Sequence, residues 1–533
     1  MSKTIQSAIK ETLSKYSEGK DFDVLIPPNS DLGDYSVNLA FKVGGNPVKN
    51  AEELKSKLQK DADINKLFSD ITIVAPGFIN FKLSSELLSR HLSEVLEEGS
   101  NFGDLKLGNK KINIEFVSAN PTGPATVHNA RAAAFGDTLG NILKKVGYKV
   151  AKEYYINDIG VQVGKLAESI RLRKRELNGE QIEFAADLYQ GEYIKDIAKE
   201  FIEKSIPDEN IQVEAIKLII GKIRNTFEVL GVVFDEWFYE SKLHESGEVG
   251  AILKKLEAEG FVVQEDEAKW LKIGDDQKAV LVKKDGSTTY LMNDIAYTKN
   301  KFDRGFDKAI NIWGTDHHGD VPRLKAGVAA LGYEQPRLEI LLHQLVMLKQ
   351  KDQKLKMSKR AGNLVLLTDL INDVGKDVIR FFFLSKDLNT HMEFDLDLAK
   401  EQSKKNPVFY IQYAFARLNS VFDKAQEKEV RDFNFSLLSS PEEQILLRTL
   451  SKFPDIIESI AKSYQVHHLA NYTQNLATQF HHFYEKNRII QPILSSGGID
   501  KELEKARLAL SRGVHTVLKN CLDLMGLDTP NRM

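Results

Sequence analysis

The sequence is nearly devoid of cysteine: Cys521 is the single one among 533 residues. A disulfide within the chain is therefore impossible, and zinc sites built from paired cysteines are excluded. The net charge is also small, −3 from 73 basic and 76 acidic residues. The net charge therefore gives no indication of nucleic-acid binding. Any contact with RNA has to come from local positive patches that recognise a folded RNA by its shape.

Long apolar runs are missing as well. No stretch approaches the ~18 uninterrupted apolar residues of a membrane span. The polar start, MSKTIQSAIKETLSKYSEGK, lacks the apolar core of a signal peptide. We therefore expect a soluble, cytoplasmic protein. Sequence repeats and long low-complexity segments are also absent, and the length allows three or four domains with real cores.

Residues 1–105 are predicted to form a small α+β unit. Helical patterning near the start is followed by a strand-like stretch, ITIVAPGFINFKL at 71–83, and by a helix from Ser84 to about Glu98. The sequence SNFGD at 100–104 has the composition of a turn or linker.

A parallel α/β pattern begins near Lys110. KINIEFVS alternates apolar and polar residues as a strand does, the loop NPTGP follows at 120–124, and a helix with apolar residues at helical spacing ends at Gly147. YKVAKEYYIND is then the next expected strand. This order predicts a parallel sheet with right-handed crossovers, in which ligands bind beyond the carboxyl ends of the strands.

The rest of the chain completes a three-domain prediction. Residues 165–270 are charged and mostly helical, and we interpret them as an insertion. Parallel α/β character returns with DKAINIWGTDHHG at 307–319, and from about residue 395 the chain is almost wholly helical. The expected fold is α/β, with an N-terminal α+β domain at 1–105, a Rossmann-like parallel-sheet domain at 106–400 and an all-α domain at 401–533.

The segment KDQKLKMSKRAGN at 351–363 carries the clearest chemical signal. Two lysines, Lys356 and Lys359, flank Met357 and Ser358. The lysines of such a loop can move with a triphosphate as negative charge develops on its leaving group. They then stabilise the transition state better than the ground state. A generic lysine run is more often a solvated turn. This block, however, resembles the KMSKS signature of class I aminoacyl-tRNA synthetases, which activate amino acids with ATP.

A second motif lies where the loop after Pro124 meets the helix. Phosphate binding there needs two hydrogen-bond donors one turn apart at a helix N-terminus, which adds its own N–H groups and partial positive charge. Class I synthetases usually carry HIGH at this place. The corresponding residues of this sequence are Thr126, Val127, His128 and Asn129. Thr126 and Asn129 can both donate hydrogen bonds, although each alone is also an ordinary residue for a helix start.

His128 stands where the family has a glycine that lets adenine lie against bare backbone. Two interpretations follow. Either the adenine shifts or stacks on the imidazole and activity is retained, which we favour because the lysine loop is intact, or nucleotide affinity is impaired. In the second case the protein is a catalytically impaired, synthetase-like tRNA-binding protein.

Longer blocks resemble one family within this class, the arginyl-tRNA synthetases, over nearly the full length. Gly33-Asp34-Tyr35 and PGFINF at 76–81 match the N-terminal additional domain of that family. The other matching blocks are IEFVSANPTGP at 114–124, YYINDIGVQVGKL at 154–166, YLMNDIAYTKNKFDRGFDKAINIWGTDHHG at 290–319, KMSKRAGN at 356–363, VIRFFFLS at 378–385, NPVFYIQYAFAR at 406–417 and RLALSRGVHTVLKNCLDLMGL at 507–527.

The resemblance implies an arginine pocket. A guanidinium requires planar, preferably bidentate, carboxylate recognition, and Asp294 with Tyr290, one helical turn apart, is implied for it. Glu115 and Asn120 are implied for the α-amino and carboxylate end, and His317 is expected nearby. Taken singly, Glu115 could equally be an edge-strand residue and Tyr290 with Asp294 an ordinary helix start.

The C-terminal helices interleave aromatic and arginine side chains. Such residues can stack on splayed anticodon bases or form the core of a helix bundle, and we expect the core for most of them. The resemblance to an anticodon-binding domain favours partial RNA contact for four, namely Tyr413, Arg417, Tyr484 and Arg488. No metal site is expected, because Asp316-His317-His318 lacks further ligands.

The implied reaction joins L-arginine to tRNA(Arg) through an arginyl-adenylate, with release of AMP and pyrophosphate. Thr126 and Asn129 would contact the phosphates, and Lys356 and Lys359 would steady the leaving pyrophosphate, with Mg²⁺ bridging its oxygens. Neither DNA nor a membrane is an expected partner, and family precedent favours a monomer. A class I synthetase for another amino acid, such as cysteine, is disfavoured because zinc-type cysteines are lacking.

Overall fold

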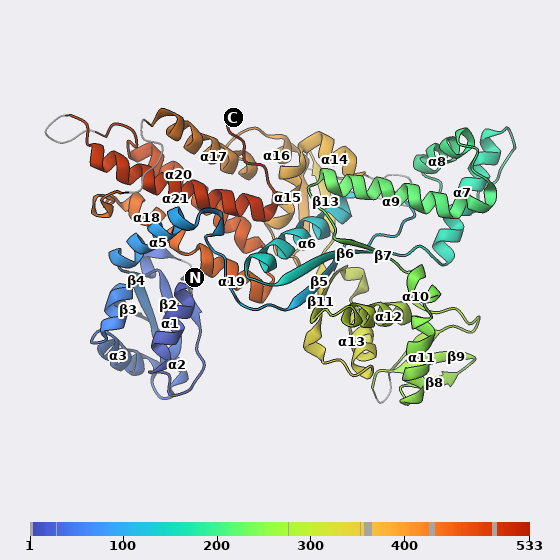
Figure 1. Ribbon diagram of the computed structural model, residues 1–533, viewed down its shortest axis with the longest axis horizontal. Coiled ribbons are helices and arrows are strands. Elements are labelled where there is room, and N and C mark those ends of the chain that lie inside the picture. Colours follow the sequence, from blue (N-terminus) through green and yellow to red (C-terminus); the bar gives the residue numbers. More distant parts are fainter. Residues whose placement is uncertain are drawn as a thin grey trace.

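The computed structural model describes residues 4–27, 29–274, 277–351, 353–355, 365–425, 432–492 and 498–533. In Figure 1 a bundle of long helices runs along the upper left and the N-terminal unit lies below it. The parallel sheet lies near the centre, and two further groups of elements extend to the right, one above the other.

The N-terminal unit is an antiparallel sheet of order β1-β2-β4-β3 with four helices. These elements are α1 (Ile5–Ser14), β1 (Val24–Leu25), β2 (Tyr35–Val37), α2 (Leu39–Lys42), α3 (Pro47–Leu58), α4 (Ala62–Leu67), β3 (Phe68–Val74) and β4 (Phe78–Leu83). The single strand expected at 71–83 was wrong, because the chain turns back at Pro76-Gly77 to form a hairpin. Gly77 has a φ of +143°, a region that disfavours other residues.

The central sheet is parallel throughout and has the order β12-β11-β5-β6-β7. Its strands are β5 (Lys111–Phe116), β6 (Lys149–Ile156), β7 (Glu236–Tyr239), β11 (Lys308–Gly314) and β12 (Leu338–His343). The chain first builds outward from β5 and then returns to place β11 on its other side. The topological switch point, where open α/β sheets bind ligands, therefore lies between β5 and β11.

Helix α6 (Val127–Lys145) fixes one side of that crevice. It crosses from β5 to β6, and its small residues allow a close approach to the sheet. A Cβ added at Gly136 would lie only 2.4 Å from the Phe116 ring, and one at Gly140 only 2.7 Å from the Lys152 side chain. This contact holds the start of α6 at the carboxyl end of β5.

Two groups of helices and strands are inserted between strands of the central sheet. Between β6 and β7 lie α7 (Val161–Leu177), α8 (Glu192–Glu203) and α9 (Ile211–Val229). After β7 come α10 (Ser241–Glu245), α11 (Glu248–Ala258), β8 (Val262–Glu265), β9 (Ala268–Lys272), β10 (Lys278–Val282) and α12 (Tyr290–Asp303), with α13 (Asp320–Ala330) following β11. Residues 165–270, expected to be mostly helical, thus also hold the sheet strand β7 and the hairpin β8–β9.

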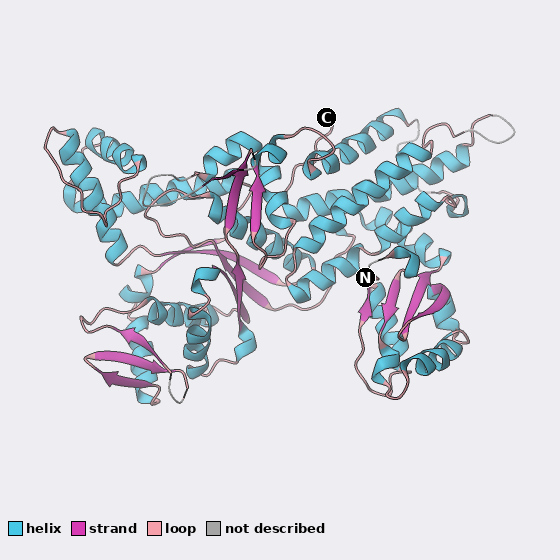
Figure 2. Ribbon diagram, turned by 180° about the vertical axis from the view of Figure 1, so that it is seen from behind, coloured by secondary structure: helices cyan, strands magenta, loops and turns pink. Residues whose placement is uncertain are grey.

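After β12 the chain forms a second small sheet and then the helical bundle. Figure 2 shows this sheet above the central one. The sheet region contains β13 (Val346–Gln350), β14 (Gln353–Leu355), α14 (Leu367–Val374), α15 (Lys376–Leu384), β15 (Met392–Asp395) and α16 (Leu396–Lys400). The bundle contains α17 (Pro407–Lys424), α18 (Pro441–Ser451), α19 (Phe453–Ser463), α20 (His467–Lys486) and α21 (Lys501–Met525), and α21 packs on α6 and on the linking helix α5 (Ser85–Glu98).

A buried charge cluster ties the bundle to the sheet domain. The fully buried Arg380 of α15 pairs with Asp137 of α6, and its Nε donates to the carbonyl of Met525 at 2.6 Å. Asp137 also accepts from Lys152 of β6 at 2.6 Å. Across the described parts of the chain, no helix combines the length and apolar character needed to traverse a lipid bilayer.

Candidate active site

The start of α6 brings Thr126 and Asn129 together. The Thr126 N–H donates to Asn129 Oδ1 at 2.9 Å, and the Thr126 hydroxyl donates to the same oxygen at 3.2 Å. Because Asn129 uses its oxygen to cap the helix, its amide nitrogen is the group that can donate to a ligand. The two residues singled out from the sequence are therefore neighbours at a helix N-terminus, where N–H groups and the helix dipole favour an anion.

The residues that follow the KMSK segment are bonded directly to this helix start. The Val127 N–H donates to the Val365 carbonyl at 3.3 Å, and the Leu367 N–H donates to the Ala125 carbonyl at 3.0 Å. Thr126 and Leu366 form a β-bridge between them. Lys356, Met357, Ser358 and Lys359 themselves lie outside the described residues, so their place at the site stays a prediction.

An acidic cluster, formed by Asp294, Glu240 and Glu115, lies on the other side of the switch point. Asp294 projects from the first turns of α12, where Thr289 caps the helix. Burial raises the pKa of Asp294 well above its usual value, and the charges of Glu115 and Glu240 raise it further. Tyr290, one turn earlier on α12, is 60% exposed, and burial together with the charge of Glu240 raises its pKa. The predicted pair does share one helix face, as expected from the spacing.

Glu240 is a member of this acidic cluster that was not predicted from the sequence. It follows directly on β7 and is only 2% exposed. Asn293 donates to one of its oxygens, and the amide nitrogen of Asn157 donates to Oε2 at 3.2 Å. Burial raises the pKa of Glu240 from 4.5 to about 7, and Asp158 adds to the shift. Its signal in the sequence was weak because β7 is a four-residue strand inside a stretch interpreted as helical.

Glu115 belongs to the same acidic cluster and is already paired. Its Oε2 accepts from Lys301 Nζ at 2.7 Å, and both side chains are buried. Ser118 donates to its other oxygen at 3.0 Å. Lys301 also donates to Asn311 of β11 at 2.9 Å. The ion pair thus bridges β5 and β11 at the switch point, and a direct contact of Glu115 with a substrate stays a prediction.

The remaining predicted arginine-site residues lie at the rim. Asn120 is exposed in the loop after β5, and its amide donates to Gln162 Oε1 of α7 at 2.9 Å. The His317 side chain is 57% exposed, lies 3.4 Å from Asp320 Oδ2, and belongs to the 3₁₀ turn Thr315–His317 that follows β11. The charges of Asp320 and Asp294 are close enough to interact. The carboxylates of the acidic cluster and its rim therefore outnumber the buried Lys301, which favours a cationic ligand.

The bundle brings three of the four predicted RNA-contacting residues together. The Arg417 guanidinium lies over the rings of both Tyr413 and Tyr484, with 4.5 Å from Cζ to each ring centroid. It also donates to the Tyr413 hydroxyl at 2.8 Å. Arg488 is exposed beyond the end of α20 and donates to the Ile490 carbonyl at 3.1 Å instead. RNA contact by these residues stays a prediction.

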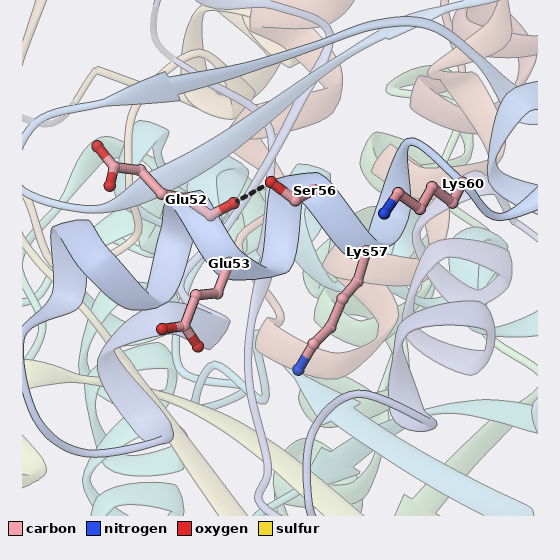
Figure 3. A pocket seen from close by; sticks show the side chains of 5 residues that line it. All are labelled: Glu52, Glu53, Ser56, Lys57 and Lys60. Carbon is pink, nitrogen blue, oxygen red and sulfur yellow. Dashed lines mark hydrogen bonds between the residues drawn. The ribbon is translucent and has the colours of Figure 1, made fainter.

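A separate hollow on α3 is lined by Glu52, Glu53, Ser56, Lys57 and Lys60. Figure 3 shows Glu52, Glu53 and Lys57 pointing outward from the helix, with Lys60 beyond its end. The Ser56 hydroxyl donates to the Glu52 carbonyl. The hollow belongs to the N-terminal unit, whereas the acidic cluster described above lies at the carboxyl ends of the central strands. Two acidic residues are followed by two basic ones along it, as is common on an ordinary solvated helix face.

Comparison with known proteins agrees with this arrangement. Three family models match successive parts of the chain: "Arginyl tRNA synthetase N terminal domain" at residues 3–83, "tRNA synthetases class I (R), catalytic domain" at 91–387 and "DALR anticodon binding domain" at 411–533. The catalytic model alone spans more than half of the sequence.

Similar proteins extend over the same length. The arginine–tRNA ligase of Thermotoga petrophila is 40% identical, covering 99% of both chains, and that of Bacillus subtilis is 40% identical over 99% of this chain and 97% of its own. The solved structure of Thermus thermophilus arginyl-tRNA synthetase superposes with a TM-score of 0.80 at 20% identity, covering 99% of each chain. The chain therefore belongs to the arginyl-tRNA synthetase family of class I synthetases and is an arginine–tRNA ligase.

Proposed function

We propose that the acidic cluster around Asp294 and Glu240 binds the guanidinium of the arginine that this ligase attaches to tRNA. The proposal rests on the convergence of the buried Glu240 carboxylate and the half-buried Asp294 carboxylate at the carboxyl edge of the sheet. A planar cation with five donors can bond to both carboxylates at once, whereas a lysine ammonium is a point charge with different geometry. Tyr290 would close the pocket from its exposed side.

We further propose that the other end of arginine faces the start of α6. Asn120, on the loop between β5 and α6, would hold the α-amino or carboxylate end there. Glu115, with Lys301 as its partner, would act at the floor of the crevice. The arginine carboxylate then lies toward Thr126 and Asn129, where the helix end attracts the phosphates of ATP. His128 and Pro124 would border the adenine side, and His317 the rim of the arginine pocket.

In the first step, an arginine carboxylate oxygen attacks the α-phosphorus of ATP. The bond from that phosphorus to the bridging oxygen of pyrophosphate breaks, and arginyl-adenylate forms. Catalysis of such a transfer is mostly positioning and charge stabilisation. Lys356 and Lys359 would stabilise the departing pyrophosphate, with Met357 and Ser358 between them.

The donors at the α6 start are amides and a hydroxyl rather than carboxylates. This set fits a Mg²⁺ ion carried by the nucleotide, and when bound the ion would supply positive charge to the phosphate oxygens.

In the second step, the 3′-terminal adenosine hydroxyl of tRNA attacks the arginyl carbonyl carbon and AMP leaves. The helical bundle would hold the anticodon region, with the Arg417 stack and Arg488 among its contacts. We also propose that the three domains span residues 1–105, 106–400 and 401–533. The working unit in this proposal is a monomer. Sedimentation of the free protein tests the latter.

The test of the pocket is arginine-dependent exchange between ATP and pyrophosphate in the presence of tRNA(Arg). Wild-type protein should support exchange. The Asp294→Asn variant, which keeps the shape of the side chain but removes its charge, should raise the arginine KM by at least tenfold, because a charge-assisted bond is lost. Its KM for ATP should stay within twofold. Exchange that is insensitive to this substitution would remove Asp294 from the arginine site.

A further inference from the structure

Residues 119–124 of the loop between β5 and α6 make three hydrogen bonds to residues outside the loop. The Tyr154 hydroxyl of β6 donates to the Ala119 carbonyl at 2.9 Å. Asn120 donates to Gln162 of α7 at 2.9 Å, and the Tyr193 hydroxyl of α8 donates to the Thr122 carbonyl at 2.7 Å. Two of these three hydrogen bonds are therefore made with the helical insertion α7–α9 and not with the sheet.

Tyr193 contacts the loop with its ring as well as its hydroxyl. A Cβ added at Gly123 would lie 3.3 Å from both Cζ and the hydroxyl oxygen of Tyr193. Such a distance is tighter than ordinary van der Waals contact, so the ring lies against bare backbone at this position. Burial raises the pKa of Tyr193, which keeps the hydroxyl protonated and able to donate.

The insertion is itself well anchored, so it can serve as a support. Helix α7 packs against both α8 and α9. The segment before α8 is tied back by the Tyr189 N–H, which donates to the fully buried Ser169 hydroxyl of α7 at 3.0 Å. On the loop side, the Thr122 N–H donates to the Asn120 carbonyl at 2.7 Å. A shift of Thr122 would therefore be passed to Asn120 through one short turn.

We propose that Tyr193 is a positioning residue for arginine binding. By holding Thr122 and Gly123 it sets where Asn120 presents its side chain, although Tyr193 itself touches no substrate. This inference rests on the proposed role of Asn120. The start of α6 is fixed separately by the Asn129 cap and by Val365 and Leu367, so loosening the loop should affect arginine more than ATP.

The test substitutes Tyr193→Phe, which removes the hydrogen bond and keeps the ring on Gly123. We expect the arginine KM in the exchange reaction to rise about three- to tenfold, as for loss of one hydrogen bond. The ATP KM and kcat should stay within about twofold. Gly123→Ala, which presses a methyl group on the Tyr193 ring, should raise the arginine KM in the same direction.

The matched control is Tyr472→Phe in the bundle. Tyr193 is half-buried and Tyr472 is buried, and the Tyr472 hydroxyl likewise donates to a backbone carbonyl, that of Thr449, at 2.9 Å. Tyr472→Phe should lower the urea midpoint of unfolding about as much as Tyr193→Phe does. It should leave the KM values for arginine and ATP unchanged. A purely structural role for Tyr193 predicts equal behaviour of the two variants, and that result would overturn the inference.

Asn120→Ala separates this inference from the proposed function. If Asn120→Ala raises the arginine KM and Tyr193→Phe does not, Tyr193 has no positioning role. If Asn120→Ala leaves the arginine KM unchanged, Asn120 loses its proposed contact, and Tyr193→Phe still decides whether the loop must be held for arginine to bind. If both substitutions raise the arginine KM, the double variant should raise it by a factor smaller than the product of the two single factors.

Discussion

Arginine affinity should rise with pH, because the pocket must lose a proton to bind a cation. Burial holds the pKa of Glu240 at about 7, compared with 4.5 in water. A carboxyl group whose pKa is raised is protonated below that value, and only its anion can pair with a guanidinium. The binding-competent fraction is then about one tenth at pH 6 and about nine tenths at pH 8, a tenfold change worth about 1.4 kcal/mol.

The arginine dissociation constant should therefore be about tenfold larger at pH 6 than at pH 8. Asp294, with its pKa also raised by burial, would change affinity in the same direction. His244 Nε2 lies 4.0 Å from Glu240, and Asn293 and Asn157 contribute neutral donors. Titration calorimetry at pH 6, 7 and 8 measures the constants. At pH 7, buffers of different ionisation enthalpy should report release of about half a proton from Glu240.

Glu240→Gln is the decisive variant. The amide keeps the size of the side chain and loses its charge, so arginine should bind roughly ten- to a hundredfold more weakly at pH 8, with a smaller dependence on pH. Asp316→Asn is the control, because its side chain is 77% exposed beside the same edge of the sheet. It should change affinity by less than twofold. Equal arginine affinity at pH 6 and pH 8 in wild-type protein would refute the reasoning.

Three further predictions address the other parts of the molecule. Lys359→Ala should slow arginine activation by orders of magnitude, as judged by pyrophosphate exchange, and barely change arginine affinity; an unchanged rate would remove this lysine from the mechanism. Arg417→Ala should weaken tRNA binding about tenfold in a filter assay through loss of stacking, and unaltered binding would assign the Arg417 stack to packing alone. Arg380→Met should lower the free energy of unfolding, measured in urea, by about 3 kcal/mol, because it breaks a buried ion pair. Lys519→Met breaks an exposed pair with Asp523 and should change the free energy of unfolding by less than about 0.5 kcal/mol. Similar values for the two variants would contradict a role for burial.

Much of the fold could be predicted because its main elements are strongly periodic. The strands β5, β6 and β11 and the helix α6 lie where alternation and helical spacing placed them. The hairpin β3–β4 was missed because apolar residues flank Pro76-Gly77 on both sides and hide the turn. The strand β7 was missed because EWFY is short and is flanked by helices. Tertiary pairing with β6, and not local pattern, makes it a strand.

The candidate site was partly predictable for the same reasons. Tyr290 and Asp294 share a helix face, so their spacing alone brings them together. Glu240 could not be found without β7, because only the end of a parallel strand places it beside α12. Tyr193 lies seventy-one residues from Thr122, and its contact depends on how the insertion folds back. Long-range contacts of this kind leave no periodic trace in a single sequence.

The most direct measurement is a crystal structure of the protein with arginine and a non-hydrolysable ATP analogue. We expect the guanidinium within hydrogen-bond distance of both Asp294 and Glu240, and the phosphates at the N–H groups that begin α6, with the arginine carboxylate facing the α-phosphorus. Arginine bound away from these carboxylates, or a nucleotide excluded from the helix start by His128, would contradict it.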